Sequence, residues 1–488
     1  MKINYTFYLL LILLLVSVES CQTDNQKTKT NSEANLETIS NSGKRLKDIL
    51  SKGKITVETD YNSHGYFLYR GTTMGFQYEL LSSFADYLGV ELELLVKRDL
   101  NEAFNDVENG DCDILAMDLA ITSERKTKMM FTKPIYKSQQ ILVQRLPENW
   151  RKMRTWDEIE SHLLRDAIDL QGKEIYTQRG SVFVQRLNNI NNETGGEMTI
   201  IEDDRSIDEL IEDVANGNIP FTVCDSHVAA INKKYHKNID IETQLGSYSQ
   251  NLAWAVPLES DSLLLEINKW LKHYKKSKEF YYVYNKYFKN SRTTMMAKSE
   301  YNSNIGNRIS PFDDLIKEYS VNIHWDWRLL ASLIYQESKF NPQAESWSGA
   351  FGLMQMMPET AKKYNVSDTS TADYQIDAGV KYLKSIDKRL KPLIADSLER
   401  IKFVMASYNV GLAHVLDAQR LAKKYDKNPE LWDKNVDYYL LNKSKPQYYQ
   451  DSVVHYGYCR GSEPYKYVNE IFKRYQHYSN LIKDDSLK

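Results

Sequence analysis

The hydrophobic periodicity of this chain changes once, near residue 290, and that change limits the folds it can adopt. From about Leu46 to Asn290, short β-type runs alternate with amphipathic segments of helical length, which is the pattern of an α/β domain. Beyond a polar interval at residues 291–309, apolar residues recur at helical spacing to the end of the chain. We therefore predict an α/β domain at residues 46–290 and a mainly α-helical domain at residues 310–488.

The α/β part contains the same pattern twice, which predicts two lobes, the second inserted into the first. A length of 488 residues also suits about three folded units, at roughly 150 residues each. The first lobe is expected to hold strands at 55–59, 90–96 and 113–117 and a helix at 78–88, and the second to hold strands at 174–177 and 221–224 with helices opening at Ser181 and Ser226.

The N-terminus has the pattern of an export signal. Lys2 precedes an apolar run, residues 7–18, that is shorter than the ~20 residues needed to cross a bilayer. We expect residues 1–20 to be a signal peptide, and Val18 to Cys21 resemble a bacterial lipobox, so that Cys21 would carry the lipid. Glu19 departs from the small residue usual there, which leaves an uncleaved anchor or a plain signal peptide as alternatives. Residues 21–45 are polar and are expected to form a tether.

Charge and cysteine content exclude several classes of function. A formal net charge of -3 offers no basic field for nucleic acid. Beyond Cys21, the chain has Cys112, Cys224 and Cys459 with no C-x-x-C spacing, so that we expect buried thiols and neither a metal site nor a cofactor.

The α/β part resembles the extracellular solute-binding proteins that capture polar amino acids. No fragment alone is specific, but their order and spacing together are. The fragments are residues 75–80 (GFQYEL), 88–90 (LGV), 110–114 (GDCDI), 121–126 (ITSERK), 131–136 (FTKPIY), 180–181 (GS) and 224–226 (CDS). The resemblance implies a bilobal periplasmic-binding-protein fold.

The same resemblance implies a ligand site. Arg125 matches the arginine that clamps a ligand carboxylate, Gly180 and Ser181 match backbone N–H donors at a helix start, and Asp225 matches the acid that meets an ammonium group. Asp118 replaces a hydroxyl that is usual in the family, and Ala120 replaces another. Asp118 could therefore pair with Arg125 and occupy the clamp, which leaves open that the domain is only a scaffold.

In the helical part, Glu337 is the candidate for acid chemistry. Ser310-Pro311 suits a helix start, and a second helix is expected from Asp326 to just before Asn341-Pro342. Glu337 follows Leu333 and Ile334 at helical spacing, so that its carboxyl lies on the apolar side near the negative end of the helix dipole. Burial and dipole both raise its pKa, as a proton donor to a glycosidic oxygen requires.

A lone glutamate at a helix end would more often lie on the surface, but Glu337 heads a series of motifs. With Glu337-Ser338, they are residues 349–358 (GAFGLMQMMP), 406–411 (ASYNVG) and 463–468 (EPYKYV). Together they resemble the soluble lytic transglycosylase family, which implies a lysozyme-like fold.

The family's functional positions can be matched one by one. Glu337 corresponds to the catalytic acid/base, with Ser338 as its neighbour. Gln355 corresponds to a residue that lines the sugar cleft, and Tyr408 with Asn409 to the pair near the acid and the bound N-acetyl group. Tyr467 corresponds to the tyrosine of the last motif, where Pro464 and Tyr465 depart from the commoner form.

The resemblance implies cleavage of peptidoglycan glycan strands without water. Glu337 would protonate the glycosidic oxygen, and the muramic acid's own C6 hydroxyl would then close a 1,6-anhydro ring. The alternatives are a goose-type muramidase, in which water completes the reaction, and a non-catalytic solute- or wall-binding lipoprotein. With the lipid anchor, the two parts resemble membrane-bound members of the family, at the periplasmic face of the outer membrane. A muropeptide or stem peptide in the binding domain would tune their activity.

Overall fold

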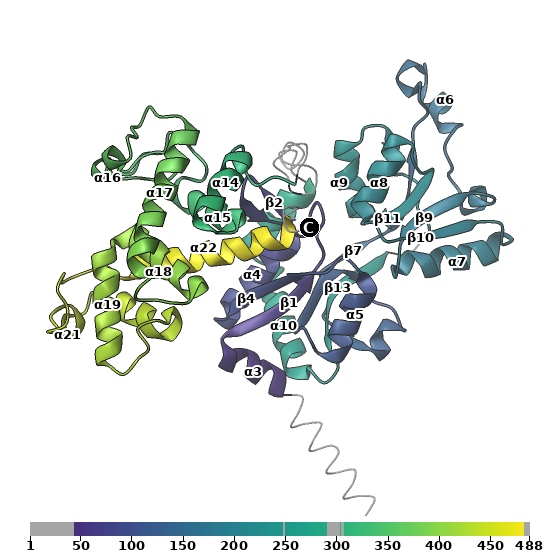
Figure 1. Ribbon diagram of the computed structural model, residues 1–488. Helices are drawn as coiled ribbons and strands as arrows, with labels where there is room; N and C mark the ends of the chain where they lie inside the picture. The colour runs from purple at the N-terminus through teal and green to yellow at the C-terminus, as the bar shows by residue number, and fades with distance from the viewer. Residues whose placement is uncertain (1–42, 247–248, 290–302, 304–306, 483–488) are drawn as a thin grey trace, which may run out of the picture. The chain divides into compact units, whose positions relative to one another are not determined.

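The computed structural model describes residues 43–246, 249–289, 303 and 307–482. They form two compact units, one of residues up to Gly65 with Gly75–Asn290 and one of Tyr66–Met74 with Ser291–Lys488. The predicted fold class, an α/β two-lobed domain followed by a helical one, is confirmed (Figure 1). The predicted signal peptide, Cys21 and most of the predicted tether and linker lie outside the described residues.

The first lobe of unit 1 is built on a sheet of strand order β4-β1-β5-β13-β6, with β7 also paired to β13. Strand β1 runs parallel to β4 and β5, whereas β13 returns antiparallel to β5. The strands are β1 (Lys54–Thr59), β4 (Glu91–Val96), β5 (Ile114–Ala120), β6 (Met129–Phe131), β7 (Tyr136–Ser138) and β13 (Gln250–Pro257), and the helices are α3 (Lys44–Lys52), α4 (Phe76–Leu88), α5 (Leu100–Asn109), α10 (Asp261–Tyr274) and α11 (Lys278–Tyr284).

The second lobe has its own sheet, of order β10-β9-β11-β8-β12. Its core is aliphatic and lies between the sheet and its helices, with Leu187, Leu210, Val214 and Val223 buried. The elements are β8 (Gln140–Arg145), α6 (Trp156–Glu160), β9 (Glu174–Gln178), α7 (Val182–Thr194), β10 (Thr199–Asp203), α8 (Ile207–Asn216), β11 (Phe221–Asp225), α9 (Ser226–Tyr235) and β12 (Ile239–Asp240). The chain enters this lobe after β7 and leaves it before β13, as an inserted lobe requires.

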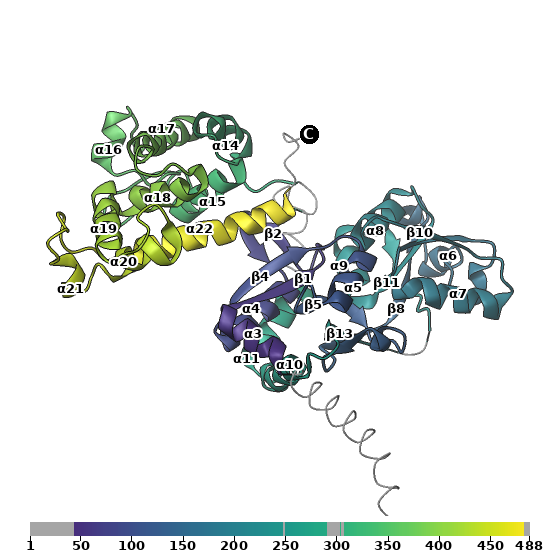
Figure 2. The ribbon, with the colours of Figure 1, turned by 60° about the horizontal axis from the view of Figure 1, so that its bottom comes forward.

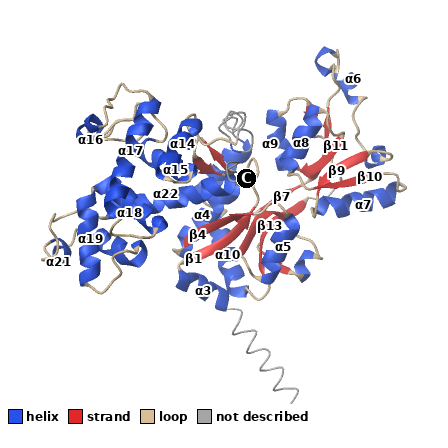
Figure 3. Cartoon of the chain, viewed as in Figure 1, coloured by secondary structure: helices blue, strands red, loops and turns tan. Residues whose placement is uncertain are grey.

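Unit 2 is predominantly helical, and the described part of its chain beyond residue 306 contributes no strand longer than an isolated bridge (Figure 3). The long helix α22 packs against α15 and α18 (Figure 2). The helices are α14 (Asp313–Ser320), α15 (Trp327–Ser338), α16 (Pro358–Lys363), α17 (Ala372–Leu390), α18 (Ser397–Val410), α19 (Leu412–Lys424), α20 (Asp437–Asn442), α21 (Pro446–Tyr449) and α22 (Ser462–Leu481).

Unit 2 also contains a β-hairpin from the N-terminal half of the sequence, formed by β2 (Phe67–Tyr69) and β3 (Thr72–Met74). The Tyr66 hydroxyl and His477 Nδ1 share a hydrogen bond of 2.6 Å. The Tyr478 hydroxyl donates to the Gly71 carbonyl at 2.8 Å. The predicted boundary at residues 291–309 assigned this hairpin to the α/β domain, whereas the structure places it in unit 2. The helical domain is therefore completed by nine residues that precede most of the α/β domain in sequence.

Two predicted helix ends in unit 2 are corrected. The first helix begins at Asp313 instead of Pro311, because the Ser310 hydroxyl and backbone N–H donate to the Asp313 carboxylate and close a turn outside the helix. Helix α15 ends at Ser338, before Asn341-Pro342, because Lys339 and Phe340 adopt left-handed backbone conformations with φ of 51° and 60°. The predicted helix start near Asp326 is confirmed, and the Asp326 side chain caps the helix by accepting from the Arg328 N–H.

The three cysteines among the described residues, Cys112, Cys224 and Cys459, are buried free thiols, as predicted. Among the residues that the structure describes, no helix has the length and apolar character that crossing a bilayer would require.

Candidate active site

Glu337 occupies the last turn of α15, a helix whose other residues are mostly buried. The sequence folds this way because apolar side chains recur along one face and Asp326 caps the start. The left-handed residues Lys339 and Phe340 then turn the chain away directly after the helix. The carboxyl of Glu337 is thereby held at the edge of the core, partly exposed.

The environment of the Glu337 carboxyl favours its neutral form. Burial raises its pKa to about 7, and the hydrogen bond that the Tyr467 hydroxyl donates to Oε1 opposes that rise. Tyr467 is itself buried on α22 and comes from a motif 130 residues away in sequence. Within the described chain, no other carboxylate perturbs this pKa. The site therefore presents one acid that is still partly protonated at neutral pH.

Tyr408 lies beside the same carboxyl, near the end of α18. Its hydroxyl donates to the Met354 carbonyl at 2.7 Å, and burial with the charge of Glu337 raises its pKa well above the usual range. Burial, with the charge of Glu337 and the hydrogen bond to it, likewise raises the pKa of Tyr467 well above the usual range. The structure thus brings Glu337, Tyr408 and Tyr467 together from three helices.

Gln355 lies in the loop between α15 and α16, in a left-handed conformation with φ of 46°. Its side-chain amide donates to the carbonyls of Ala344 at 3.0 Å and Gly352 at 2.9 Å. A buried glutamine, Gln375, supports the same loop by accepting from the Leu353 N–H at 2.7 Å. The amide nitrogen of Gln355 therefore holds the loop in shape.

Ser338 and Asn409 are adjacent to the cluster in sequence but differ in their contacts. The Ser338 hydroxyl donates to the Ile334 carbonyl of its own helix at 3.2 Å and is buried. Asn409 is exposed next to Tyr408. Met354 and Met356 are buried whereas Met357 is 46% exposed, so that the methionines contribute mostly core packing.

In the α/β unit, the structure brings Arg125 to Gly180-Ser181. The guanidinium donates to the carbonyls of Ala120 at 3.2 Å and Gly180 at 3.4 Å and lies 4.5 Å over the Phe104 ring. Burial lowers its pKa to about 10, which leaves it charged at neutral pH. Ser181 precedes α7, but its backbone N–H donates to the Gln178 carbonyl instead of pointing freely into the site.

The sequence left open that Asp118 pairs with Arg125, but in the structure Asp118 contacts two histidines instead. Its Oδ2 is 2.7 Å from His64 Nε2 and 3.1 Å from His227 Nε2. Burial alone would raise the pKa of Asp118, but the bonds from His227 and His64 hold it well below its usual range. Asp225 lies near this group, and burial raises its pKa to about 6. The three predicted ligand residues therefore do not form one group. Arg125 lies beside Gly180-Ser181, whereas Asp225 lies near Asp118.

Sequence reasoning missed both histidines. His64 and His227 are separated by most of the first lobe and all but the end of the second, so that no spacing motif connects them. Asp118, which replaces a hydroxyl usual in the family, was the one signal in the sequence that polar partners such as these histidines were needed. A carboxylate in a buried ligand site requires polar partners.

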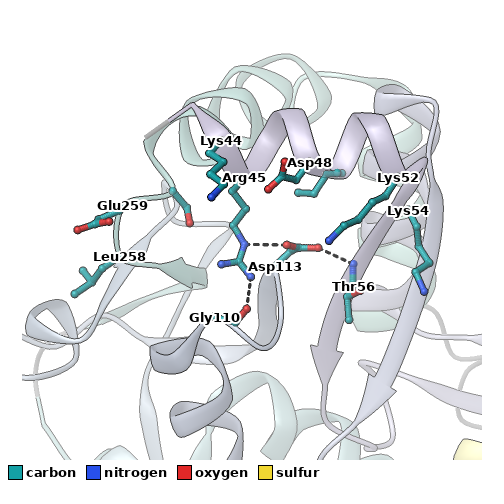
Figure 4. Close-up of a pocket in the computed structure, with 12 residues that line it drawn as sticks. Lys44, Arg45, Asp48, Lys52, Lys54, Thr56, Gly110, Asp113, Leu258 and Glu259 are labelled. Atoms are coloured by element: carbon teal, nitrogen blue, oxygen red, sulfur yellow. Dashed lines mark hydrogen bonds and ion pairs between the residues drawn. The ribbon is translucent and has the colours of Figure 1, made fainter. Parts of the chain in front are cut away.

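A pocket of about 730 Å³ lies elsewhere in unit 1, beneath α3 (Figure 4). Its central charges satisfy one another, since Arg45 donates to Asp113 at 2.8 Å and to the Gly110 carbonyl at 2.6 Å. The other oxygen of Asp113 accepts from the Thr56 N–H at 2.9 Å. These groups connect α3 to the sheet and include none of the predicted site residues.

Comparisons with known proteins match the α/β part and the helical part of the chain to two different families. The family of bacterial extracellular solute-binding proteins, family 3, matches residues 54–290, and the transglycosylase SLT domain matches residues 314–431. A curated protein from Desulfosudis oleivorans, membrane-bound lytic murein transglycosylase F, is 32% identical over 88% of this chain and 90% of its own length.

Solved structures of solute-binding proteins are similar to part of the chain. A mutant of ArgBP from T. maritima has 22% identity and a TM-score of 0.43, over 50% of this chain and 99% of its own. An ABC uptake transporter substrate-binding protein from Streptococcus pneumoniae with bound histidine has 20% identity and a TM-score of 0.43, over 51% of this chain and 98% of its own.

Proposed function

Because the chain belongs to the membrane-bound lytic murein transglycosylase F family, we propose that it cleaves the β-1,4 bond between N-acetylmuramic acid and N-acetylglucosamine in peptidoglycan, with Glu337 as its acid and base. The observation that carries the proposal is the Glu337 carboxyl itself. It is one acid, at the edge of the core, with its pKa raised to about 7 and a tyrosine hydroxyl donating to it.

The reaction needs only this carboxyl. Neutral Glu337 gives its proton to the glycosidic oxygen as the C1–O bond breaks, and positive charge develops at C1. The resulting carboxylate takes the proton of the muramic acid's C6 hydroxyl while that oxygen bonds to C1. The product is a 1,6-anhydro sugar, no water is consumed, and Glu337 ends protonated as it began.

Neighbouring groups position these steps. Tyr467 keeps donating to the Glu337 carboxylate after the proton has left, which stabilises the charged intermediate state of the enzyme. Tyr408 and Gln355 would shape the wall of the sugar site, and Asn409, which is exposed, would contact the acetamido group. Ser338 supports the helix end through its bond to Ile334 and not through the substrate.

Hydrolysis, as in goose-type muramidases, is the alternative for the same acid. Two-carboxylate glycosidases use a second Asp or Glu as nucleophile or to activate water. The electrostatic neighbours of Glu337 in the described chain are tyrosines, which favours the route without water.

Replacing the acid tests the assignment. Glu337→Gln preserves the shape of the side chain but removes the transferable proton, so that solubilisation of purified sacculi should fall by about 100-fold or more. The matched control is Glu318→Gln, an exposed glutamate on α14, which should digest at the wild-type rate. Retention of more than about a tenth of the activity by Glu337→Gln, with the fold intact by circular dichroism, would exclude Glu337 as the acid.

The α/β unit is proposed to bind a carboxylate-bearing ligand that tunes the enzyme, and a wall-derived stem peptide or muropeptide suits it. The support is Arg125, a charged guanidinium whose hydrogen bonds within the described chain go to two carbonyls and not to a carboxylate. A fork of N–H donors at that position bonds both oxygens of an anion. A purely structural scaffold is the alternative.

Calorimetry on the full chain separates ligand binding from a scaffold role. Stem peptide should bind and change the rate of sacculus digestion, and both effects should disappear in Arg125→Ala but persist in Arg98→Ala, an exposed arginine of the same unit. Regulation requires the peptide to bind one conformation better than another. Absence of binding would leave the scaffold role, and tight binding of a free amino acid would instead indicate a solute receptor.

Attachment to the periplasmic face of the outer membrane through a lipid on Cys21 completes the proposal. One residue carries the acyl chains, so that Cys21→Ala should move the protein from the membrane fraction to the soluble fraction or leave it uncleaved. Unchanged fractionation with normal processing would exclude lipidation there.

A further inference from the structure

Two histidines and an aspartate meet inside unit 1, and none of them belongs to the group formed by Glu337, Tyr408 and Tyr467 in unit 2. The ligand-type atoms of His64, Asp118 and His227 all lie within 4.8 Å of one another. The three side chains are 2%, 13% and 12% exposed. Two imidazole nitrogens therefore face one carboxylate oxygen, Oδ2 of Asp118, in a mostly buried space.

Asp118 is held so that Oδ2 faces the histidines. Its other oxygen, Oδ1, accepts from Gln77 Nε2 at 2.6 Å and from the Tyr136 hydroxyl. Gln77 is fixed in turn, because its own oxygen accepts from Trp254 Nε1 at 2.7 Å. Such outer hydrogen bonds to ligating side chains are typical of metal sites.

His227 has an outer partner as well. Its Nδ1 lies 3.1 Å from the Ser138 hydroxyl, so that Nε2 is the nitrogen directed at Asp118. A ligating histidine commonly makes a hydrogen bond through its second nitrogen, which fixes the tautomer and the ring orientation. The Tyr136 ring packs edge-on against the His227 ring at 5.1 Å and restrains it further.

The surroundings carry more negative charge than the side chains neutralise. Asp225 is buried beside the group and Asp60 is half-buried there, and each has one buried carboxylate oxygen without a hydrogen-bond partner among the described residues. Buried carboxylates are costly unless they are paired or face a cation. The two unpartnered oxygens are a second observation, independent of the histidines, that points to a cation at this place.

We propose that His64, Asp118 and His227 bind a divalent transition-metal ion of the zinc type. Two imidazoles and one carboxylate form a ligand set that such ions accept, and it contains no thiolate. Ligand atoms of a tetrahedral zinc site lie about 3.3 Å apart, so that the present separations of 2.7 and 3.1 Å need to widen by about 0.6 Å or less.

The ion would join the two lobes of unit 1. Asp118 lies on β5 and His64 follows β1, both in the first lobe, whereas His227 lies on α9 in the second. Three protein ligands leave a fourth position for water or for a ligand atom. Metal binding would therefore favour the conformation in which the lobes are closed on each other.

Zinc titration of the full chain tests the site. Protein purified in detergent and stripped with a chelator should bind one equivalent of Zn²⁺ by calorimetry and melt at a higher temperature with it. Affinity should fall by more than about 10-fold in His227→Asn and Asp118→Asn. His162→Asn, an exposed histidine of the same unit, should bind as the wild type does.

X-ray absorption at the zinc edge of the wild-type complex keeps the test independent of whether a variant folds. Two imidazole ligands per zinc would support the site. Absence of stoichiometric zinc binding, or binding that survives in both His227→Asn and Asp118→Asn, would overturn the proposal. So would a zinc spectrum without imidazole, and none of these outcomes bears on transglycosylase activity.

Discussion

At the scale of single residues, the proposed chemistry depends on a balance at Glu337. Burial raises the pKa of this carboxyl to about 7, and the hydrogen bond from Tyr467 lowers it. The acid acts in its protonated form, so that activity should be present below pH 7 and decline as the pH rises through about 7.

Tyr467→Phe should move that decline to higher pH. The substitution removes the donor that favours the charged carboxylate, which raises the pKa of Glu337 further. The measurement is kcat for glycan cleavage as a function of pH. Tyr475→Phe is the control, because this tyrosine on the same helix bonds to Asp326 at 2.9 Å and not to Glu337. An alkaline limb that stays in place or moves to lower pH would contradict the assigned role.

The position of Glu337 was predictable and its partner was not. Helical spacing from Leu333 and Ile334 places the carboxyl on the apolar side, because side-chain direction in a helix follows from sequence distance alone. The contact with Tyr467 depends on how α22 packs against α15. The family motifs suggested that Tyr467 belongs to the site, but residue spacing could not predict the contact. The left-handed backbone at Gln355 is likewise a tertiary effect, since a non-glycine residue seldom adopts it.

At the scale of elements, the β2–β3 hairpin supports the helix that carries Glu337. The Thr72 hydroxyl is 2.8 Å from that of Tyr335, two residues before the acid. A Cβ at Gly71 would lie 2.7 Å from the Phe340 ring, 2.7 Å from the Tyr478 hydroxyl and 2.9 Å from the Tyr335 ring. The hairpin therefore contacts the chain on both sides of the acid.

Gly71→Ala should destabilise unit 2 through that contact. Overpacking costs about 1–3 kcal/mol, in addition to the backbone strain of a left-handed residue at φ of 74°. Gly457→Ala isolates the strain alone, because it has φ of 61° and no atom within 4 Å of the added Cβ. Thermal unfolding of the two variants should differ, with Gly71→Ala less stable; equal melting temperatures would show that the hairpin contact contributes nothing.

The elements themselves were largely predictable, and the hairpin was not. Strands such as β1 and β11 and the helices α7 and α9 follow from local apolar patterns within one or two residues. Strands β2 and β3 have three residues each and no alternation long enough to recognise. Their burial depends on α22, which lies about 400 residues later in sequence, and no local signal contains that contact.

At the scale of the whole molecule, the chain passes between its two units more than once. It leaves unit 1 after Gly65, forms the hairpin of unit 2, and returns at Gly75 before it finally enters unit 2 near residue 291. A cut near residue 290 would separate the helices from their hairpin. The full chain is therefore the proper sample for binding and activity measurements on either part.

In the proposed reaction, one carboxyl performs both proton transfers and no water enters. Mass spectrometry of the fragments released from purified sacculi by the wild-type chain tests it most directly. The chemistry at Glu337 predicts muramic acid ends that are about 18 Da lighter than reducing ends, because the C6 hydroxyl replaces water at C1. Fragments that end in ordinary reducing muramic acid would contradict the claim and identify the protein as a hydrolase.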